Sequence, residues 1–273
     1  MTALTVARPA RFGDLFAAEW IKLRSLRSTA WTLVLTTVFV VGSAAVAALA
    51  DVRNLAGGAS GRMRPDGFLP FDAYPPAGYL TLMLVAGSAG ALTVVSEYGT
   101  GSIRTTTVAV PARGSVVLAK AVVTAVVWTA AGAVISTGSF LVSQAILDGE
   151  GLGVSFTHPG VARALVASAL LAPVCGVFGV GLGVLIRHSA MTMVSSAFLL
   201  LMLPMLFSTS RRWSADVNHA TLFAAWKRLV QNWGDSPDNL EYTATVPGSL
   251  AVFVLWPLVA VVSAVVTVRR RDV

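Results

Sequence analysis

Six long apolar runs constrain the fold of this chain more than any other feature. Each run reaches or approaches the roughly 20 residues that a helix needs to cross a bilayer core of about 30 Å. The runs lie at residues 31–50, 79–95, 116–147, 161–186, 190–207 and 248–268. Only Arg187-His188-Ser189 separates the fourth run from the fifth, which predicts a tight helical hairpin. The sequence therefore predicts an all-α polytopic membrane protein with six transmembrane helices.

Composition supports lipid as the solvent for much of the chain. Only 12% of the 273 residues are charged and 55% are apolar, whereas a soluble domain carries roughly 25% charged residues. The net charge of +7 is no sign of nucleic-acid binding, because its distribution follows the membrane topology. The single cysteine, Cys175, lies in an apolar run, so it offers neither a disulfide framework nor a thiol metal cluster.

Basic residues predict the orientation. If both termini lie on one side, that side holds 12 of the 20 basic residues and 4 acidic ones, a net charge of +8. The opposite side holds 8 basic and 9 acidic residues, a net charge of −1. We therefore expect both termini in the cytoplasm.

The apolar runs contain almost no ionisable groups. Lys120 and Arg163 lie near run ends, where we expect them to reach the interface by snorkelling. An ion-coupled transporter or proton pump would normally keep a carboxylate or histidine at mid-membrane. Small residues are abundant instead, and we interpret them as helix-packing positions. They include Gly87, Gly90, Gly176, Gly179, Gly181 and Gly183.

The segment before the first run predicts an interfacial amphipathic helix at residues 12–27. Its apolar face collects Phe12, Leu15, Phe16, Trp20, Leu23 and Leu26. Its basic residues are Lys22, Arg24 and Arg27, which suit the inner headgroup layer. Glu19 projects into the apolar face, where an unpaired carboxylate is costly. It either reaches headgroups or Lys22, or it pairs with another cytoplasmic element; for the second case we expect Arg104, Arg113 or a partner subunit.

The cytoplasmic loop after the second run carries a distinct pattern. If it starts as a helix, Glu97, Gly101 and Arg104 share one stripe, followed by Pro111 and Arg113. This stripe offers a negative charge, a gap for close approach and a positive charge, and so a surface for docking protein. An ordinary helix end with a glycine turn explains the same residues equally well.

The loop at residues 208–247 is too long for a plain turn. Within it, Leu222, Phe223, Trp226, Leu229, Val230 and Trp233 recur at helical spacing, with Lys227 and Arg228 off that face. This pattern predicts a short amphipathic or re-entrant helix on the outer face, before the last span.

These motifs together resemble the type-2 export permeases of the ATP-binding-cassette transporters. The Glu-x-x-x-Gly-x-x-Arg pattern followed by Pro-x-Arg (residues 97–113) looks like their coupling region. The stretch at residues 19–28 resembles the entry helix of their bacterial members. The resemblance implies a cytoplasmic coupling helix that contacts a separate nucleotide-binding ATPase subunit through Glu97, Gly101 and Arg104, and through Pro111 and Arg113. It carries over no substrate-binding residue.

The resemblance also implies partners and a location. No phosphate-binding Gly-x-x-x-x-Gly-Lys-[Ser/Thr] run is present, so ATP and Mg would be bound by the partner subunit and this chain would be no enzyme. Residues 1–30 would form a cytoplasmic segment and residues 31–273 the permease domain. We expect a dimer with an identical or homologous permease chain, joined at the second and fifth spans, in the bacterial cytoplasmic membrane.

Two other functions fit the sequence. One is an ATP-independent secondary transporter or channel, which the lack of intramembrane charge disfavours. The other is a non-transporting immunity or sensor component. Within the exporter reading, a drug, an antimicrobial peptide and a lipid are all candidate solutes.

Overall fold

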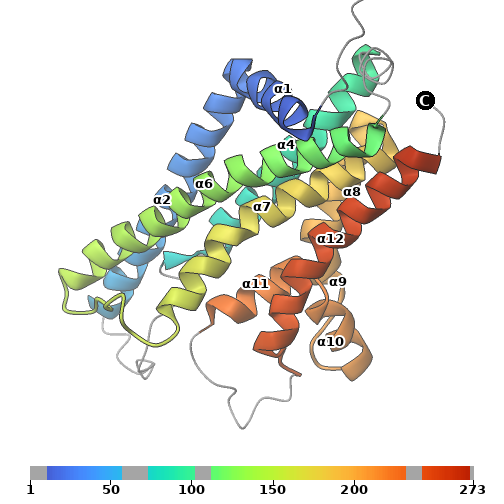
Figure 1. Cartoon of the computed structure of the whole chain (residues 1–273). Coiled ribbons are helices and arrows are strands. Elements are labelled where there is room, and N and C mark those ends of the chain that lie inside the picture. Colours follow the sequence, from blue (N-terminus) through green and yellow to red (C-terminus); the bar gives the residue numbers. More distant parts are fainter. Residues whose placement is uncertain (1–10, 57–72, 102–111, 232–241, 271–273) are drawn as a thin grey trace, which may run out of the picture.

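A computed structural model describes residues 11–56, 73–101, 112–231 and 242–270 (Figure 1). No strand occurs in these ranges. The helices are α1 (Phe12–Ser25), α2 (Arg27–Ala56), α4 (Pro76–Thr100), α6 (Arg113–Asp148), α7 (Val161–Ile186), α8 (Ser189–Ala197), η1 (Phe198–Met202), α9 (Leu203–Leu206), α10 (Arg212–His219), α11 (Leu222–Val230) and α12 (Val246–Arg270). Six helical segments are long and apolar enough to cross a membrane. The predicted all-α polytopic fold is confirmed.

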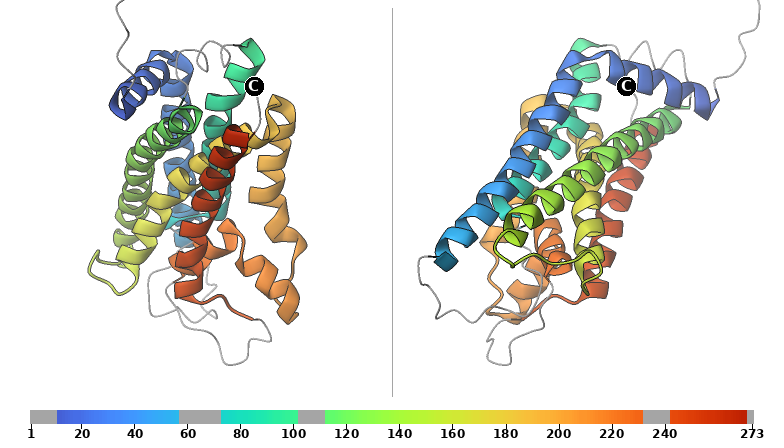
Figure 2. Two further views of the ribbon diagram at one scale, coloured as in Figure 1. Left: turned by 45° about the vertical axis from the view of Figure 1, so that its right-hand side comes forward. Right: turned by 90° about the vertical axis from the view of Figure 1, so that its left-hand side faces the viewer.

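Different helices lie at the two ends of the bundle. Helix α1, the end of α4, the start of α6, the α7–α8 turn and the end of α12 gather at one end (Figures 1 and 2). Helices α10 and α11 lie at the opposite end. The first described helix and the end of the last one therefore lie at the same end of the bundle.

Helix α7 packs at the centre of the bundle, against α4, α6 and α12. Its glycines allow backbone-to-backbone contact. A Cβ atom at Gly179 would collide with the carbonyl oxygen of Gly87, and one at Gly90 with that of Gly176. Gly181 packs in the same way against Ala260 of α12. The packing interpretation of these glycines is confirmed, because no methyl group fits between the helices.

The fourth and fifth spans form the predicted tight hairpin. Helix α7 ends at Ile186, and Arg187 adopts a left-handed conformation with φ of 59°. The Arg187 N–H donates to the carbonyl oxygen of Gly183 at 3.0 Å. His188 then caps α8, since its Nδ1 accepts from the Met191 N–H. Two residues thus reverse the chain.

The fifth span is not a single α-helix. Between α8 and α9 it widens into the π-helical turn η1, directly before Pro204. A proline ring crowds the carbonyl four residues earlier in a regular α-helix. The wider turn gives the ring of Pro204 room and lets the span continue to Leu206.

Helix α11 confirms the predicted short helix before the last span, although its apolar face meets protein. Trp226 is buried, and its Nε1 donates to the Ser168 hydroxyl of α7 at 3.1 Å. The Tyr79 ring stacks on the Trp226 ring at a centroid distance of 5.0 Å. Trp226 therefore anchors α11 to the bundle instead of resting in lipid headgroups. Trp233 lies outside the described residues, and α10 was not predicted.

Candidate functional site

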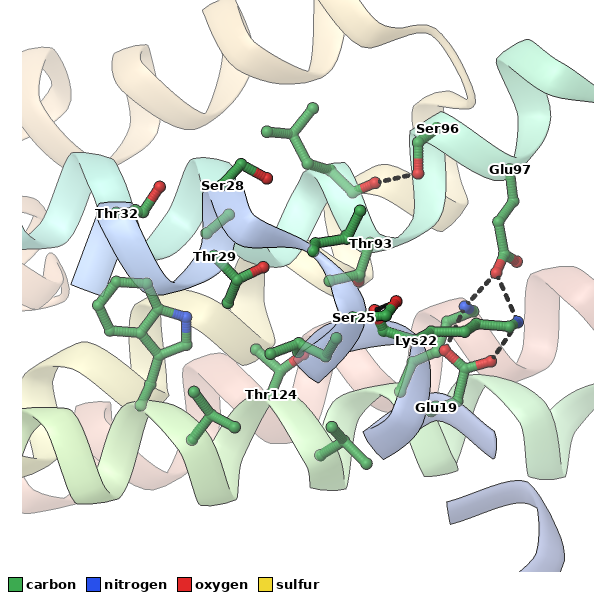
Figure 3. Close-up of a pocket in the computed structure, with 18 of the residues that line it drawn as sticks. Glu19, Lys22, Ser25, Ser28, Thr29, Thr32, Thr93, Ser96, Glu97 and Thr124 are labelled. Atoms are coloured by element: carbon green, nitrogen blue, oxygen red, sulfur yellow. Dashed lines mark hydrogen bonds and ion pairs between the residues drawn. The ribbon is translucent and has the colours of Figure 1, made fainter. Parts of the chain in front are cut away.

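Four charged side chains from three helices form one closed network, which we call the four-residue cluster (Figure 3). The Lys120 Nζ of α6 lies 2.7 Å from Glu19 Oε2 of α1 and 2.7 Å from Glu97 Oε1 of α4. The Lys22 Nζ of α1 lies 2.8 Å from Glu19 Oε1 and 3.0 Å from Glu97 Oε1. Each lysine therefore bridges both carboxylates.

The cluster is largely removed from water. The side chain of Lys120 is 4% exposed, and those of Glu19 and Glu97 are 10% and 12% exposed. Lys22 is half exposed, at 50%. The prediction that Lys120 snorkels to the interface is wrong, because two carboxylates compensate its charge inside the protein and no route to headgroups is needed.

Burial and ion pairing change the pKa of Lys22 in opposite directions. Partial burial alone would lower the pKa of Lys22. Hydrogen bonds to Glu19 and Glu97, together with their negative charges, outweigh that effect and raise the pKa above its ordinary value of 10.5. The Lys22 ammonium is therefore bound more firmly as a cation than it would be in water.

Helix α1 forms as predicted and lies against the bundle by its Glu19 face. Its start is fixed by the Asp14 carboxylate, which accepts from the Arg11 N–H at 2.9 Å. Glu19 is its one buried residue, while Trp20 and Arg24 remain exposed. The helix ends at Ser25, two residues before the predicted end, and the exposed Arg27 begins α2. Glu19 pairs with a cation, but with Lys120 and Lys22. No pair with Arg113 is found, and Arg104 lies outside the described residues.

Of the predicted coupling residues, the structure describes Glu97, Gly101 and Arg113. Helix α4 continues to Thr100, and Gly101 ends it in a left-handed conformation with φ of 72°. The stripe from Glu97 therefore does not run through Gly101 as one helix. Gly101 is exposed, and Arg113 begins α6 half buried. Arg104 and Pro111 lie outside the described residues, as does most of the expected coupling helix.

A cavity of about 720 Å³ adjoins the cluster, between α1, α2, α4 and α6. The cluster forms one end (Figure 3). The rest of the lining contains both hydroxyl and apolar side chains. The hydroxyl side chains include Thr29, Thr32 and Thr124, and the apolar ones include Leu33, Val127 and Trp128. Its volume falls within the range of small-molecule sites.

A further cation, Arg187 at the α7–α8 turn, lies against Tyr98 of α4. The guanidinium carbon of Arg187 lies 5.2 Å from the centroid of the Tyr98 ring. Within the described part of the chain, the buried Nε and Nη2 atoms of Arg187 have no hydrogen-bond partner. Tyr98 follows Glu97 directly, so Arg187 contacts the same last turn of α4 that carries the cluster.

Sequence reasoning found Glu19, Lys22 and Glu97 but missed Lys120 as their partner. Lys120 is a charged residue in the third apolar run, but its position opposite Glu19 and Glu97 depends on how α1, α4 and α6 cross. No group of three or more metal-ligating side chains occurs in the described ranges. What the described residues do provide is a set of ion pairs beside a cavity with room for a small molecule.

Comparison with protein-family models and with curated proteins gives no match to this chain.

Proposed function

We propose that this chain is the transmembrane permease subunit of an ATP-binding-cassette exporter. It would move an apolar or amphipathic solute outward, with ATP hydrolysed by a separate subunit. The four-residue cluster is the observation that carries this proposal. It joins α1 to both α4 and α6, the two helices that flank residues 102–111. In the resembling family, the corresponding loop contacts the nucleotide-binding subunit.

The cluster fixes the two helices that flank residues 102–111, α4 and α6, to α1. Breaking a buried ion pair leaves an uncompensated charge and costs about 3–5 kcal/mol. The ends of α4 and α6 and the face of α1 are therefore held together. A displacement of the loop by an ATPase subunit would move these three elements as a unit, and α1 leads directly into the first span, α2.

The position of the charges favours an ATP-driven protein over an ion-coupled one. The cluster lies at one end of the bundle (Figure 1), beside α1. A carboxylate that carries protons or ions across would be expected at mid-membrane. The excess of basic residues at this end supports a cytoplasmic location for both termini. The resemblance to bacterial export permeases supports a bacterial cytoplasmic membrane.

The experiment is reconstitution with the ATPase encoded by a neighbouring reading frame. We expect the two proteins to purify together. Glu97→Ala and Arg104→Ala should lower solute-stimulated ATP hydrolysis severalfold, with membrane insertion intact. Arg212→Ala is the matched control, because Arg212 is exposed at the opposite end of the bundle, on α10. Wild-type hydrolysis in both cytoplasmic variants, or failure of any ATPase to associate, would count against the proposal.

A further inference from the structure

The cavity beside the four-residue cluster has two chemically different parts. Its far wall is apolar and weakly polar, with Leu33, Val127 and Trp128 from α2 and α6. Its near end carries the four charges. A ligand that fills it must therefore combine an apolar body with a polar head.

Two polar atoms at the cavity lack partners within the described residues. Thr124 lines the cavity and is 1% exposed, yet its hydroxyl makes no hydrogen bond. Glu97 uses only Oε1 in the cluster, and its Oε2 is buried without a partner. Leaving such groups unsatisfied is costly, and more so for a charged oxygen. Both atoms gain from a ligand that supplies a hydrogen-bond donor.

The free acceptor atom selects the head group. Both lysines already donate to the two carboxylates, so the cluster carries no net charge. The atom left over is the acceptor Glu97 Oε2. An ammonium group would donate a charge-assisted hydrogen bond to it, whereas an ionised sulfate or phosphate head has no proton to donate.

The cavity also reaches the outer surface of the bundle. Two of its apolar lining residues, Leu26 between α1 and α2 and Leu92 on α4, are 56% and 48% exposed. An alkyl chain dissolved in the membrane can therefore enter from the side.

We propose that this cavity binds a single-chain amphiphile with an amine head, the ammonium at Glu97 and the chain along α2 and α6. If the chain is the exporter permease proposed above, this assigns the class of its solute. Because Glu97 belongs to the cavity and to the four-residue cluster, the bound ammonium shares the carboxylate that fixes α1 to α4. Occupancy of the cavity is thereby linked to the end of the bundle that flanks residues 102–111.

The test uses the purified full chain in lipid nanodiscs without any ATPase. A twelve-carbon amine that carries a photoreactive diazirine is irradiated, and labelled peptides are identified by mass spectrometry. Dodecylamine, dodecanol and dodecyl sulfate serve as competitors. We expect labelling on α2, α4 and α6, with dodecylamine competing at least tenfold better than the other two. Glu97→Gln should abolish this preference.

Two further variants locate the site. Ala89→Phe fills the cavity and should abolish labelling; Thr124→Val removes only the hydroxyl and should weaken binding severalfold without changing side-chain volume. Leu185→Phe is the matched control, in the uncharged groove of about 330 Å³ between α7 and α12, and should label as wild type. Equal competition by dodecanol, or full labelling in folded Ala89→Phe and Thr124→Val proteins, would overturn the assignment. Because this assay needs no ATP, its failure is distinct from a failure of ATPase association.

Discussion

Lys120 and Glu19 lie 101 positions apart in the chain, yet the Lys120 Nζ and the Glu19 Oε2 are only 2.7 Å apart. The pair fixes an amphipathic helix to the third span. Helix α1 keeps Trp20 and Ile21 exposed, and their apolar side chains suit the membrane surface. Glu19 points the other way, into protein. One face of α1 therefore contacts the bundle, and the exposed face is the one that we expect to meet lipid.

Lys120→Met should release α1 from the bundle. The change leaves Glu19 with Lys22 alone, and Lys22 is half exposed. Removal of one member of a buried ion pair costs about 3–5 kcal/mol. The distance between spin labels at Ala18 and Val122, exposed on α1 and α6, should broaden markedly in electron paramagnetic resonance.

Lys22→Met is the control for this experiment. An ion pair of a partly exposed lysine contributes about 0.2–1 kcal/mol, so α1 should stay docked. If Lys120→Met leaves the spin-label distance unchanged, the Lys120 pairs do not hold α1.

A double-mutant cycle should show that Glu19 and Lys120 act together. Glu19→Gln and Lys120→Met each break the same contact, so the second change should cost less once the first is made. Residues in one ion-pair network typically show interaction energies of about 0.5–3 kcal/mol. Docking free energies from the spin-label populations give this value, and strict additivity would refute the coupling.

The contribution of Lys22 to docking should be insensitive to pH across the physiological range. Its folded pKa is raised above 10.5. A raised lysine pKa stabilises the docked state at any pH below the free value of about 10.4 and loses that effect as pH rises through the folded pKa. The difference in docking free energy between wild type and Lys22→Met, taken from the spin-label populations, should therefore stay constant from pH 7 to 10. Release of α1 near pH 8 would contradict this account.

The spans were predictable because hydrophobic length alone decides them. Each of the six runs is helical. Five of the helices match the predicted run or extend beyond it, and the fifth, at Ser189–Leu206, ends one residue before the predicted run does. The α7 glycines were predictable for a similar reason, since small residues at regular spacing permit close contact. Local sequence also predicted α1 and α11 from their helical periodicity.

Of the two partners of Glu19, Lys22 was among the predicted alternatives, but Lys120 could not be derived from the sequence. The apolar surroundings of Glu19 showed that it needs a cation, but the choice among Lys120, Arg104 and Arg113 depends on how three helices cross. From the sequence, a helix could either continue through Gly101 or end there. In the structure Gly101 has a φ of 72°, which ends α4. Interior space such as the cavity arises from the mutual tilt of helices, which hydropathy does not encode.

Glycine contacts between α4 and α7 should be intolerant of any side chain. Gly179→Ala would drive a methyl group into the Gly87 carbonyl. Overpacking of this kind costs about 1–3 kcal/mol. We expect a lower melting temperature in detergent by fluorescence-detected size exclusion. Gly42→Ala is the matched control, because nothing lies within 4 Å of the added atom; removal of a helical glycine should leave the melting temperature equal or higher. Equal melting of both variants would show that the close contact carries no energy.

The proposed permease dimer should form at the fifth span more readily than at the second. The fifth span exposes a row of large apolar side chains, whereas α4 is mostly buried and exposes Leu92. That row consists of Met191, Val194, Phe198, Met202, Met205 and Leu206. An exposed apolar face of this kind can contact lipid as well as a second permease chain. A crosslinking experiment that measures the distance between two chains distinguishes these cases.

Single cysteines at Val194, Met202 and Leu92, in a Cys175→Ala background, provide this test. A closed two-fold pair places equivalent positions opposite each other. We expect covalent dimers from Val194 or Met202 on mild oxidation in membranes, and few from Leu92. Val166, exposed on α7, is the control for random collision. Dimers at Leu92 alone would move the seam to the second span, and equal yields at all four positions would indicate collision without a dimer.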